Sequence, residues 1–171
     1  MLKQVKQSVL IVVDVQNGFT PGGNLAVANA DEIIPKINQL AQKFEHIVLT
    51  QDWHPDQHIS FADNHPNKKP FETIELDYGR QVLWPKHCVQ GTPTGLNGYL
   101  REHQINTVYI VGIATDFCVA WTAIDAAELG FDTYVIEDAC KAIDLNGSLQ
   151  QAWQDMSQKG VHRIEASSIL L

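Results

Sequence analysis

The sequence has few cysteines and no long apolar run, and each shortage argues against a class of protein. The three cysteines, Cys88, Cys118 and Cys140, are an odd number, widely spaced and outside any CxxC pair. We therefore expect no disulfide framework and a reducing, cytoplasmic setting. The first apolar run, residues 9–13, follows a mainly polar start, residues 1–7. It is too short for a signal peptide or a membrane span, so we expect neither.

Positive charge is also scarce. Twelve lysines and arginines face 20 aspartates and glutamates, which gives a formal net charge of −8. This balance argues against nucleic acid or an anionic membrane as the main partner, and we expect a small molecule instead. With 171 residues, of which 44% are hydrophobic and 19% charged, the chain suits one globular domain over residues 1–171. Whether it forms a homo-oligomer stays open.

Apolar and amphipathic segments alternate in the order typical of a parallel α/β sheet. The segment SVLIVVDVQ (8–16) is β-branched and apolar on both faces, like a strand covered by helices. An apolar stripe predicts a helix from about Ala30 to Phe44. Further strands are predicted at 46–51, 107–113, 132–138 and 161–166, and further helices near 95–103, 117–129 and 147–159. This alternation predicts an α/β domain with right-handed crossovers.

A long segment without periodic pattern lies between the second and third of these strands. It runs for roughly forty residues, from Asp52 to about Thr94, and is rich in Asp, His, Trp and Pro. Loops of that length are uncommon in compact domains unless they are functional. Ligands of open α/β sheets bind beyond the carboxyl ends of the strands, where Asp14, Asp52 and Cys118 follow three of the predicted strands. We therefore expect a site at that edge.

Cys118 falls where a helix is expected to begin. If Thr115 or Asp116 caps that helix, the thiol lies in its first turn. There, unpaired backbone N–H groups and the helix dipole favour a thiolate and could hold an oxyanion. The alternative is a small buried hydrophobic side chain. Cys88 and Cys140 lack such a setting and are interpreted as structural.

Asp14 interrupts an apolar run, where an unpaired carboxylate is costly. It either caps a loop or serves as an acid/base partner with a raised pKa.

Asp52 and His54 are separated by one residue, so in an extended backbone they point the same way. His87 could join them from the far end of the long loop. One carboxylate and two imidazoles suit zinc, iron or manganese, and His58 and Ser60 could supplement the set. The alternative is an ordinary polar surface.

Five segments, in order along the chain, resemble the nicotinamidases, a branch of the isochorismatase-like cysteine hydrolases. They are VDVQNGF (13–19), GGNLAV (22–27), TQDWHP (50–55), LWPKHCVQGT (83–92) and GIATDFCV (112–119). The resemblance spans about Val9 to Val161. It implies a doubly wound parallel sheet of about six strands flanked by helices.

The resemblance also implies residue roles. Cys118 matches the nucleophile and Asp14 the acid/base residue. Ile113–Ala114 matches a non-proline cis peptide, with the amides of Ala114 and Cys118 facing the oxyanion. The remaining matches are metal ligands, with one residue near the metal directly or through water, and pocket walls. The ligands are Asp52, His54 and His87, the nearby residue is Ser60, and the walls are Phe19, Leu25 and Trp84. His58 matches a ligand of some members only.

The implied activity is hydrolysis of nicotinamide to nicotinate and ammonia through a thioester, with pyrazinamide as a further substrate. The implied cofactor is one divalent metal ion, zinc in the first place and iron or manganese as alternatives. Two other functions stay open. One is an amide hydrolase of the same superfamily with a different substrate, and the other is a non-catalytic relative that binds a pyridine.

A third catalytic residue implied by the resemblance, a lysine, has no match here. In relatives it lies in a segment that follows the HCVQGT motif, whereas here HCVQG (87–91) leads directly to TPTGLNGYLREH (92–103). Either this sequence omits a segment of the protein, or the protein is truly shortened and catalytically impaired. We favour the first, because a deletion is expected to remove a central strand of the sheet. Lys86 is no substitute, since two-residue alternation points it away from the side that His87 faces.

Overall fold

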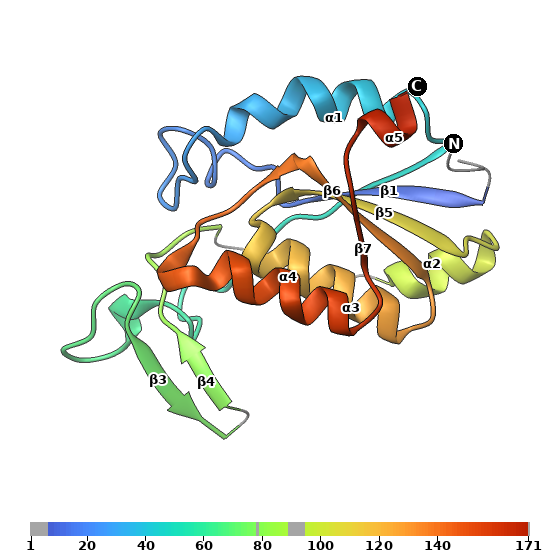
Figure 1. Cartoon of the computed structure of the whole chain (residues 1–171). Helices are drawn as coiled ribbons and strands as arrows, with labels where there is room; N and C mark the ends of the chain where they lie inside the picture. Colours follow the sequence, from blue (N-terminus) through green and yellow to red (C-terminus); the bar gives the residue numbers. More distant parts are fainter. Residues whose placement is uncertain (1–6, 78, 89–94, 171) are drawn as a thin grey trace.

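A five-stranded parallel sheet forms the centre of the protein (Figure 1). The computed structural model describes residues 7–77, 79–88 and 95–170. The strand order is β2-β1-β5-β6-β7, and every neighbouring pair is parallel. The strands are β1 (Ser8–Val13), β2 (His46–Leu49), β5 (Thr107–Ile113), β6 (Asp132–Lys141) and β7 (His162–Ile164). All five predicted strands are confirmed, and the sheet has five strands where about six were expected.

Helices cover both faces of this sheet, as the doubly wound prediction requires. Helices α1 (Ile34–Ala41) and α5 (Ser167–Leu170) lie on one face, and α2 (Leu96–Glu102), α3 (Ala120–Glu128) and α4 (Ser148–Gln158) lie on the other (Figure 1). Short turns precede or join them: η1 (Ala30–Ile33), η2 (Ala62–Asn64), η3 (Thr115–Val119) and η4 (Leu145–Gly147). In the described part of the chain, no helix is long and apolar enough to cross a membrane.

Strand β1 shows why the central strands are apolar on both faces. Val9 and Ile11 pack in the core beneath α3 and α4, whereas Leu10 and Val12 pack in the core beneath α1. All four are almost fully buried. Burial of each such side chain stabilises the fold by about 1.5–3 kcal/mol, so both layers of helix hold this strand in register.

The edge strand β2 is different. Among the described residues it pairs only with β1, and Ile47 and Leu49 are 42% and 72% exposed. The sheet runs without a break from β2 to β7. The expectation that a deletion would leave a gap in the middle of the sheet is therefore wrong, because a strand beside β2 would lie at the edge. Most of the junction between HCVQG and TPTG falls in residues 89–94, outside the described residues.

The long loop contains an antiparallel hairpin that the sequence did not predict. Its strands are β3 (Thr73–Leu76) and β4 (Gly79–Val82), and it projects from the body of the protein (Figure 1). β3 alternates exposed and half-buried residues over only four positions and β4 does not alternate, so neither strand carries a long periodic signal. An isolated parallel bridge between Phe61 and Trp84 joins the chain on the two sides of this hairpin.

Candidate active site

Side chains from the strand ends and the long loop line a small cavity of about 250 Å³. This volume lies below the roughly 300–1,000 Å³ typical for drug-sized ligands, so the cavity suits a smaller molecule. The lining residues are Phe19, Leu25, Asp52, His54, His58, Ser60, Gln81, Trp84, His87, Ala114, Phe117, Cys118, Trp121 and Ile143. Every site residue expected from the sequence is in this set except Asp14, which contacts Cys118.

Cys118 and Asp14 form a hydrogen-bonded pair at one end of the cavity. The thiol donates to the Asp14 carboxylate, and the backbone N–H of Ala114 donates to the sulfur. Burial, together with the charge of Asp14, raises the pKa of Cys118 well above its usual 9.0. Burial also raises the pKa of Asp14 above 3.8, although hydrogen bonds from Thr50 and Cys118 act against it. The raised pKa of Asp14 agrees with the expectation, whereas the shift of the Cys118 pKa is opposite in direction to the one expected for a thiolate.

The turn that carries Cys118 is built differently from the predicted capped helix. Residues 115–119 form a single π-helical turn with Ala114 at its N-cap and no side-chain cap. Asp116 is buried, and its carboxylate accepts hydrogen bonds from the backbone N–H groups of Ile143 and Asp144 and from the Ser148 hydroxyl. The prediction of a Thr115 or Asp116 cap is therefore wrong. The expected cis peptide between Ile113 and Ala114 is confirmed.

Asp52, His54 and His87 converge in the lining of the same cavity. One carboxylate oxygen of Asp52 lies 2.9 Å from Nε2 of His54, and the other lies 3.0 Å from Nε2 of His87. The three ligand atoms lie within 4.8 Å of one another, as expected for the predicted metal-ligating set. Burial alone would raise the pKa of Asp52, but hydrogen bonds from the two imidazoles lower it to about 2.

The tautomer of His87 shows that this cluster fits a metal ion. Nδ1 of His87 lies 2.6 Å from the Pro85 carbonyl oxygen, which can only accept, so Nδ1 carries the proton. Nε2 therefore faces the Asp52 oxygen with a lone pair unless it is protonated as well. A cation between them, either a proton or a metal ion, is needed for the contact to be favourable. A backbone carbonyl that fixes the far nitrogen is typical of metal-binding histidines.

His58 and Ser60 lie beside this cluster. The ring of His58 is 4.3 Å from that of His54 between centroids, and its Nδ1 is 2.7 Å from the buried Ser60 hydroxyl. Burial, and then the charge of His54, lowers the pKa of His58. The two residues therefore extend the polar end of the cavity, as the sequence suggested.

Aromatic side chains line the same cavity. Trp84 meets Phe117 edge-on with the ring centroids 5.0 Å apart, and Phe19 lies 5.6 Å from the ring of His87. Sequence reasoning named Phe19, Leu25 and Trp84 but missed Phe117 and Trp121. A signal existed for both, because one precedes Cys118 and the other lies three residues after it. Two further wall residues, Gln81 and Ile143, carried no signal.

No lysine or arginine is among the described residues that line the cavity. Lys86 forms an ion pair with Asp56, and its side chain is 41% exposed. This agrees with the prediction that Lys86 does not take the place of the missing lysine. The thiol and carboxylate therefore meet, in the described part of the chain, without a basic side chain in the wall of the cavity.

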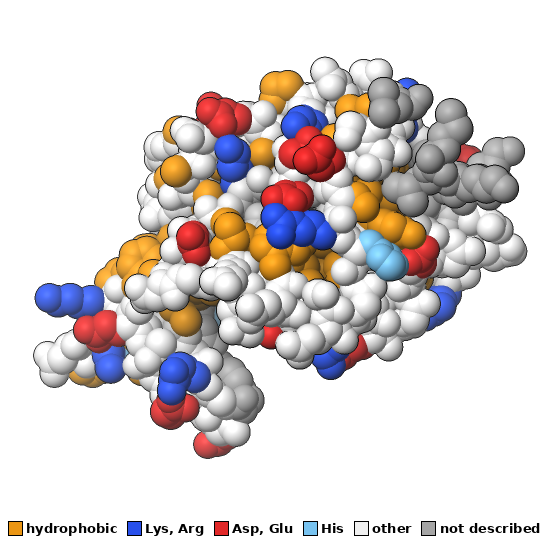
Figure 2. All heavy atoms as spheres, viewed as in Figure 1, with side chains coloured by type: hydrophobic (Ala, Val, Ile, Leu, Met, Phe, Trp, Pro, Cys, Tyr) orange, Lys and Arg blue, Asp and Glu red, His pale blue; other side chains and the backbone are white. Residues whose placement is uncertain are grey.

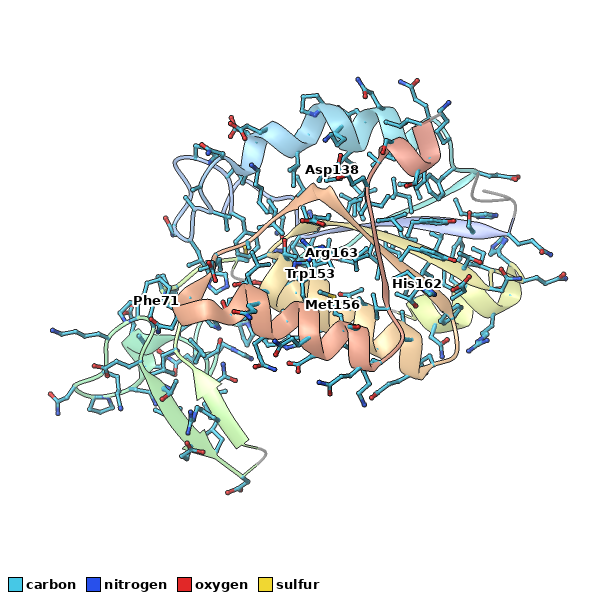
Figure 3. The ribbon with its side chains drawn as sticks, in the orientation of Figure 1. Phe71, Asp138, Trp153, Met156, His162 and Arg163 are labelled. Atoms are coloured by element: carbon cyan, nitrogen blue, oxygen red, sulfur yellow. The ribbon has the colours of Figure 1, made fainter. Side chains whose placement is uncertain are left out.

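A larger but more open hollow of about 880 Å³ lies between α4 and the end of β6. Figure 3 shows Trp153 and Arg163 close together at this place, and Figure 2 shows acidic and basic side chains in contact on the same face. The Arg163 guanidinium lies 4.4 Å from the ring centroid of Trp153 and forms an ion pair with Glu137. Since Arg163 and Glu137 already satisfy each other, this hollow shows no sign of a reactive site.

Comparisons with known proteins point to one family. The model of the isochorismatase domain matches residues 8–168. The chain is 57% identical over 209 positions to a nicotinamidase of Acinetobacter baylyi, covering 99% of this chain and 98% of that protein. It matches the solved nicotinamidase/pyrazinamidase of Acinetobacter baumanii with a TM-score of 0.93 and 61% identity, covering 97% and 99%. It also matches a zinc complex of a Pyrococcus horikoshii pyrazinamidase with a TM-score of 0.75 and 34% identity, covering 93% and 99%.

The alignment with the Acinetobacter baylyi nicotinamidase also shows how much shorter this chain is. It extends over 209 positions, whereas the chain has 171 residues, so at least 38 positions of the relative have no counterpart here. That size agrees with the segment expected to carry the lysine. The residues expected to line the site from the rest of the chain are still found in the described cavity, except Asp14.

Proposed function

Because this chain belongs to the isochorismatase family and its similar relatives are nicotinamidases, we propose that it hydrolyses the carboxamide of nicotinamide to nicotinate and ammonia. One observation carries the proposal. A thiol, a carboxylate that accepts its proton and a backbone N–H meet at a small aromatic cavity that is also lined by a cluster of side chains able to hold a metal ion. Pyrazinamide has the same ring-nitrogen and carboxamide arrangement, so it is a second expected substrate.

Chemistry begins with the Cys118–Asp14 pair. Asp14 takes the thiol proton as the sulfur attacks the carboxamide carbon, and the N–H groups of Ala114 and Cys118 receive the oxyanion. Asp14 then gives this proton to the leaving nitrogen, which departs as ammonia and leaves a thioester. Water, deprotonated by Asp14, attacks the thioester, and nicotinate leaves as the sulfur regains its proton. A carboxyl group with a raised pKa suits both directions of transfer.

Asp52, His54 and His87 would hold one divalent metal ion. When bound, this ion supplies a Lewis acid for the pyridine nitrogen, which orients the ring with its carboxamide toward Cys118. Zinc is our first choice, supported by the zinc complex of the relative, and iron or manganese suits the same donor set. Ser60 and His58 would complete the surroundings. Phe19, Leu25 and Trp84 would hold the ring between Cys118 and the metal ligands.

A second candidate function is pyridine binding with little turnover. The observation that favours it is the lack of a basic side chain in the described cavity wall, together with the raised pKa of Cys118. Without a cation to stabilise the thiolate, proton removal from sulfur depends on Asp14 alone.

Ammonia release from nicotinamide by the zinc-loaded 171-residue chain separates these functions. The hydrolase predicts release that is lost by about 10³-fold or more in Cys118→Ala, with zinc content unchanged. Equal release by the two proteins contradicts hydrolysis, and calorimetric binding of nicotinamide by both would then support the second candidate. Release from other carboxamides but not from nicotinamide would assign a different substrate within the family.

A further inference from the structure

The backbone at Asp14 has an unusual conformation that its neighbours must hold in place. Its φ is 51°, in the left-handed region that residues other than glycine rarely adopt. Such a conformation persists only where the surrounding structure fixes it. Asp14 directly follows β1, so whatever holds it also sets the direction of its carboxylate toward Cys118.

Thr50, directly after β2, makes two reciprocal contacts with Asp14. Its hydroxyl oxygen accepts a hydrogen bond from the Asp14 backbone N–H at 3.2 Å and donates its proton to the Asp14 carboxylate at 2.6 Å. A hydroxyl group has one proton and two lone pairs, so one side chain serves both contacts. The backbone N–H of Thr50 bonds the Val12 carbonyl at 2.9 Å, which anchors Thr50 to β1. Asp14 is thus held by both its backbone and its side chain.

Gln16, which follows β1, binds the backbone of Asp52, which follows β2. Its amide oxygen accepts a hydrogen bond from the backbone N–H of Asp52 at 2.7 Å, and its amide nitrogen donates to the Asp52 carbonyl at 3.2 Å. The two partners settle which end of the amide is oxygen. Because Gln16 holds the Asp52 backbone, the Asp52 carboxylate is left to face His54 and His87.

Each of two loops therefore contributes one side chain that binds the other loop. The loop after β1 carries Asp14 and Gln16, and the loop after β2 carries Thr50 and Asp52. We infer that Thr50 and Gln16 are positioning residues, which hold the Asp14 carboxylate against Cys118 and Asp52 at the metal site. Together they set the spacing between the bond-cleaving pair and the metal ligands. The inference rests on the proposed function for its catalytic consequence.

The test for Thr50 compares Thr50→Val, which removes the hydroxyl at similar shape, with Thr50→Ser, which keeps it. Thr50→Val should lower kcat by about 10- to 100-fold with zinc content unchanged, and Thr50→Ser should restore most of the activity. In Thr50→Val the Asp14 carboxylate is no longer held against the sulfur, so its negative charge raises the pKa of Cys118 by a smaller amount than in the wild type. The pH midpoint of Cys118 alkylation by iodoacetamide, read by peptide mass spectrometry, should therefore fall by about half a unit or more.

The test for Gln16 uses Gln16→Met and a zinc-binding isotherm of the intact chain. Loss of the hydrogen bonds between Gln16 and the backbone of Asp52 should weaken zinc binding by about 10- to 100-fold. Thr50→Val should leave zinc binding unchanged. Matched controls remote from the cavity are Thr107→Val and Gln151→Met, whose side chains bond Asn106 and Asp155. Both controls should behave like the wild type in every assay.

Several results would overturn the inference. One is an unchanged alkylation midpoint and kcat in Thr50→Val, and another is wild-type zinc affinity in Gln16→Met. A third is an equal loss of zinc affinity, kcat and thermal stability in both variants without rescue by Thr50→Ser, because that pattern means a structural role alone. If the wild-type chain releases no ammonia, the proposed function fails, but the zinc isotherm and the alkylation midpoint still decide the inference.

Discussion

The thiol of Cys118 donates a hydrogen bond to the buried carboxylate of Asp14, although the two residues follow different strands of the sheet, β5 and β1. β1 and β5 pair in parallel with Val13 opposite Gly112, so their carboxyl ends lie side by side. The contact leaves a neutral thiol next to its own proton acceptor. Attack by sulfur therefore requires proton transfer to Asp14.

The first prediction concerns Asp14 and stability. Burial raises the pKa of Asp14 above 3.8, so the folded protein binds its proton more tightly than the unfolded chain does. The stability that this carboxyl contributes is complete below about pH 4 and is lost as the pH rises through the folded pKa. Asp14→Asn, which stays neutral, should therefore raise the melting temperature by about 2–4 °C at pH 7–8 while ammonia release is abolished.

The same variant should show no stability gain near pH 3.5, where the native carboxyl is also protonated. Melting curves of both proteins across this pH range check the prediction. A gain that is constant with pH would show that charge burial at Asp14 is not its cause.

The second prediction concerns metal binding. Zinc that binds only the folded chain should raise its stability by about 2.7 kcal/mol at a zinc concentration 100 times the Kd. His54→Ala removes one of the three converging ligands and should abolish most of this increase. His162→Ala is a matched control, because His162 is exposed and its nearest acidic partner is Asp132. Calorimetric melting with and without zinc makes the comparison, and an equal increase in His54→Ala would contradict the assigned ligand set.

The third prediction concerns the aromatic wall. Trp84 packs edge-on against Phe117 and Phe71, so Trp84→Ala should widen the cavity and loosen a bound ring. We expect KM for nicotinamide to rise by about tenfold and kcat to fall by less, since the Cys118–Asp14 pair is untouched. Trp153→Ala, in the hollow beside α4, should leave KM unchanged. Steady-state kinetics check this, and a loss confined to kcat would contradict a binding role for Trp84.

The fourth prediction concerns the edge of the sheet. Val12 and Leu49 are register partners on β1 and β2, but their side chains are 7% and 72% exposed. Val12→Thr buries a hydroxyl in an apolar core and should lower the free energy of unfolding by about 1–3 kcal/mol. Leu49→Thr should change it by less than about 0.5 kcal/mol. Denaturant unfolding compares the two, and an equally large loss for Leu49→Thr would mean that β2 is covered in solution.

Much of the fold and of the candidate site could be read from local patterns. The apolar runs placed all five strands of the sheet, because burial on both faces leaves little choice of residue. The hairpin β3–β4 was missed, since its half-exposed strands need no such pattern. The spacing of Asp52 and His54 predicted that their side chains point the same way, and the two lie 2.9 Å apart. The contacts of Thr50 with Asp14 and of Gln16 with Asp52 cross 36 positions of sequence and had no local signal.

The sequence by itself determined the order of strands and helices and the chemical kinds of side chain at the strand ends. Both follow from short-range periodicity, which depends on burial and backbone geometry alone. Only the tertiary structure decided that Cys118 shares a hydrogen bond with Asp14 and that Asp116 accepts hydrogen bonds from the backbone of Ile143 and Asp144. It also decided that β2 is an edge strand of the sheet that the described residues form. The reason is physical: desolvation, charge and hydrogen bonding at each of these residues come from neighbours that only folding brings close.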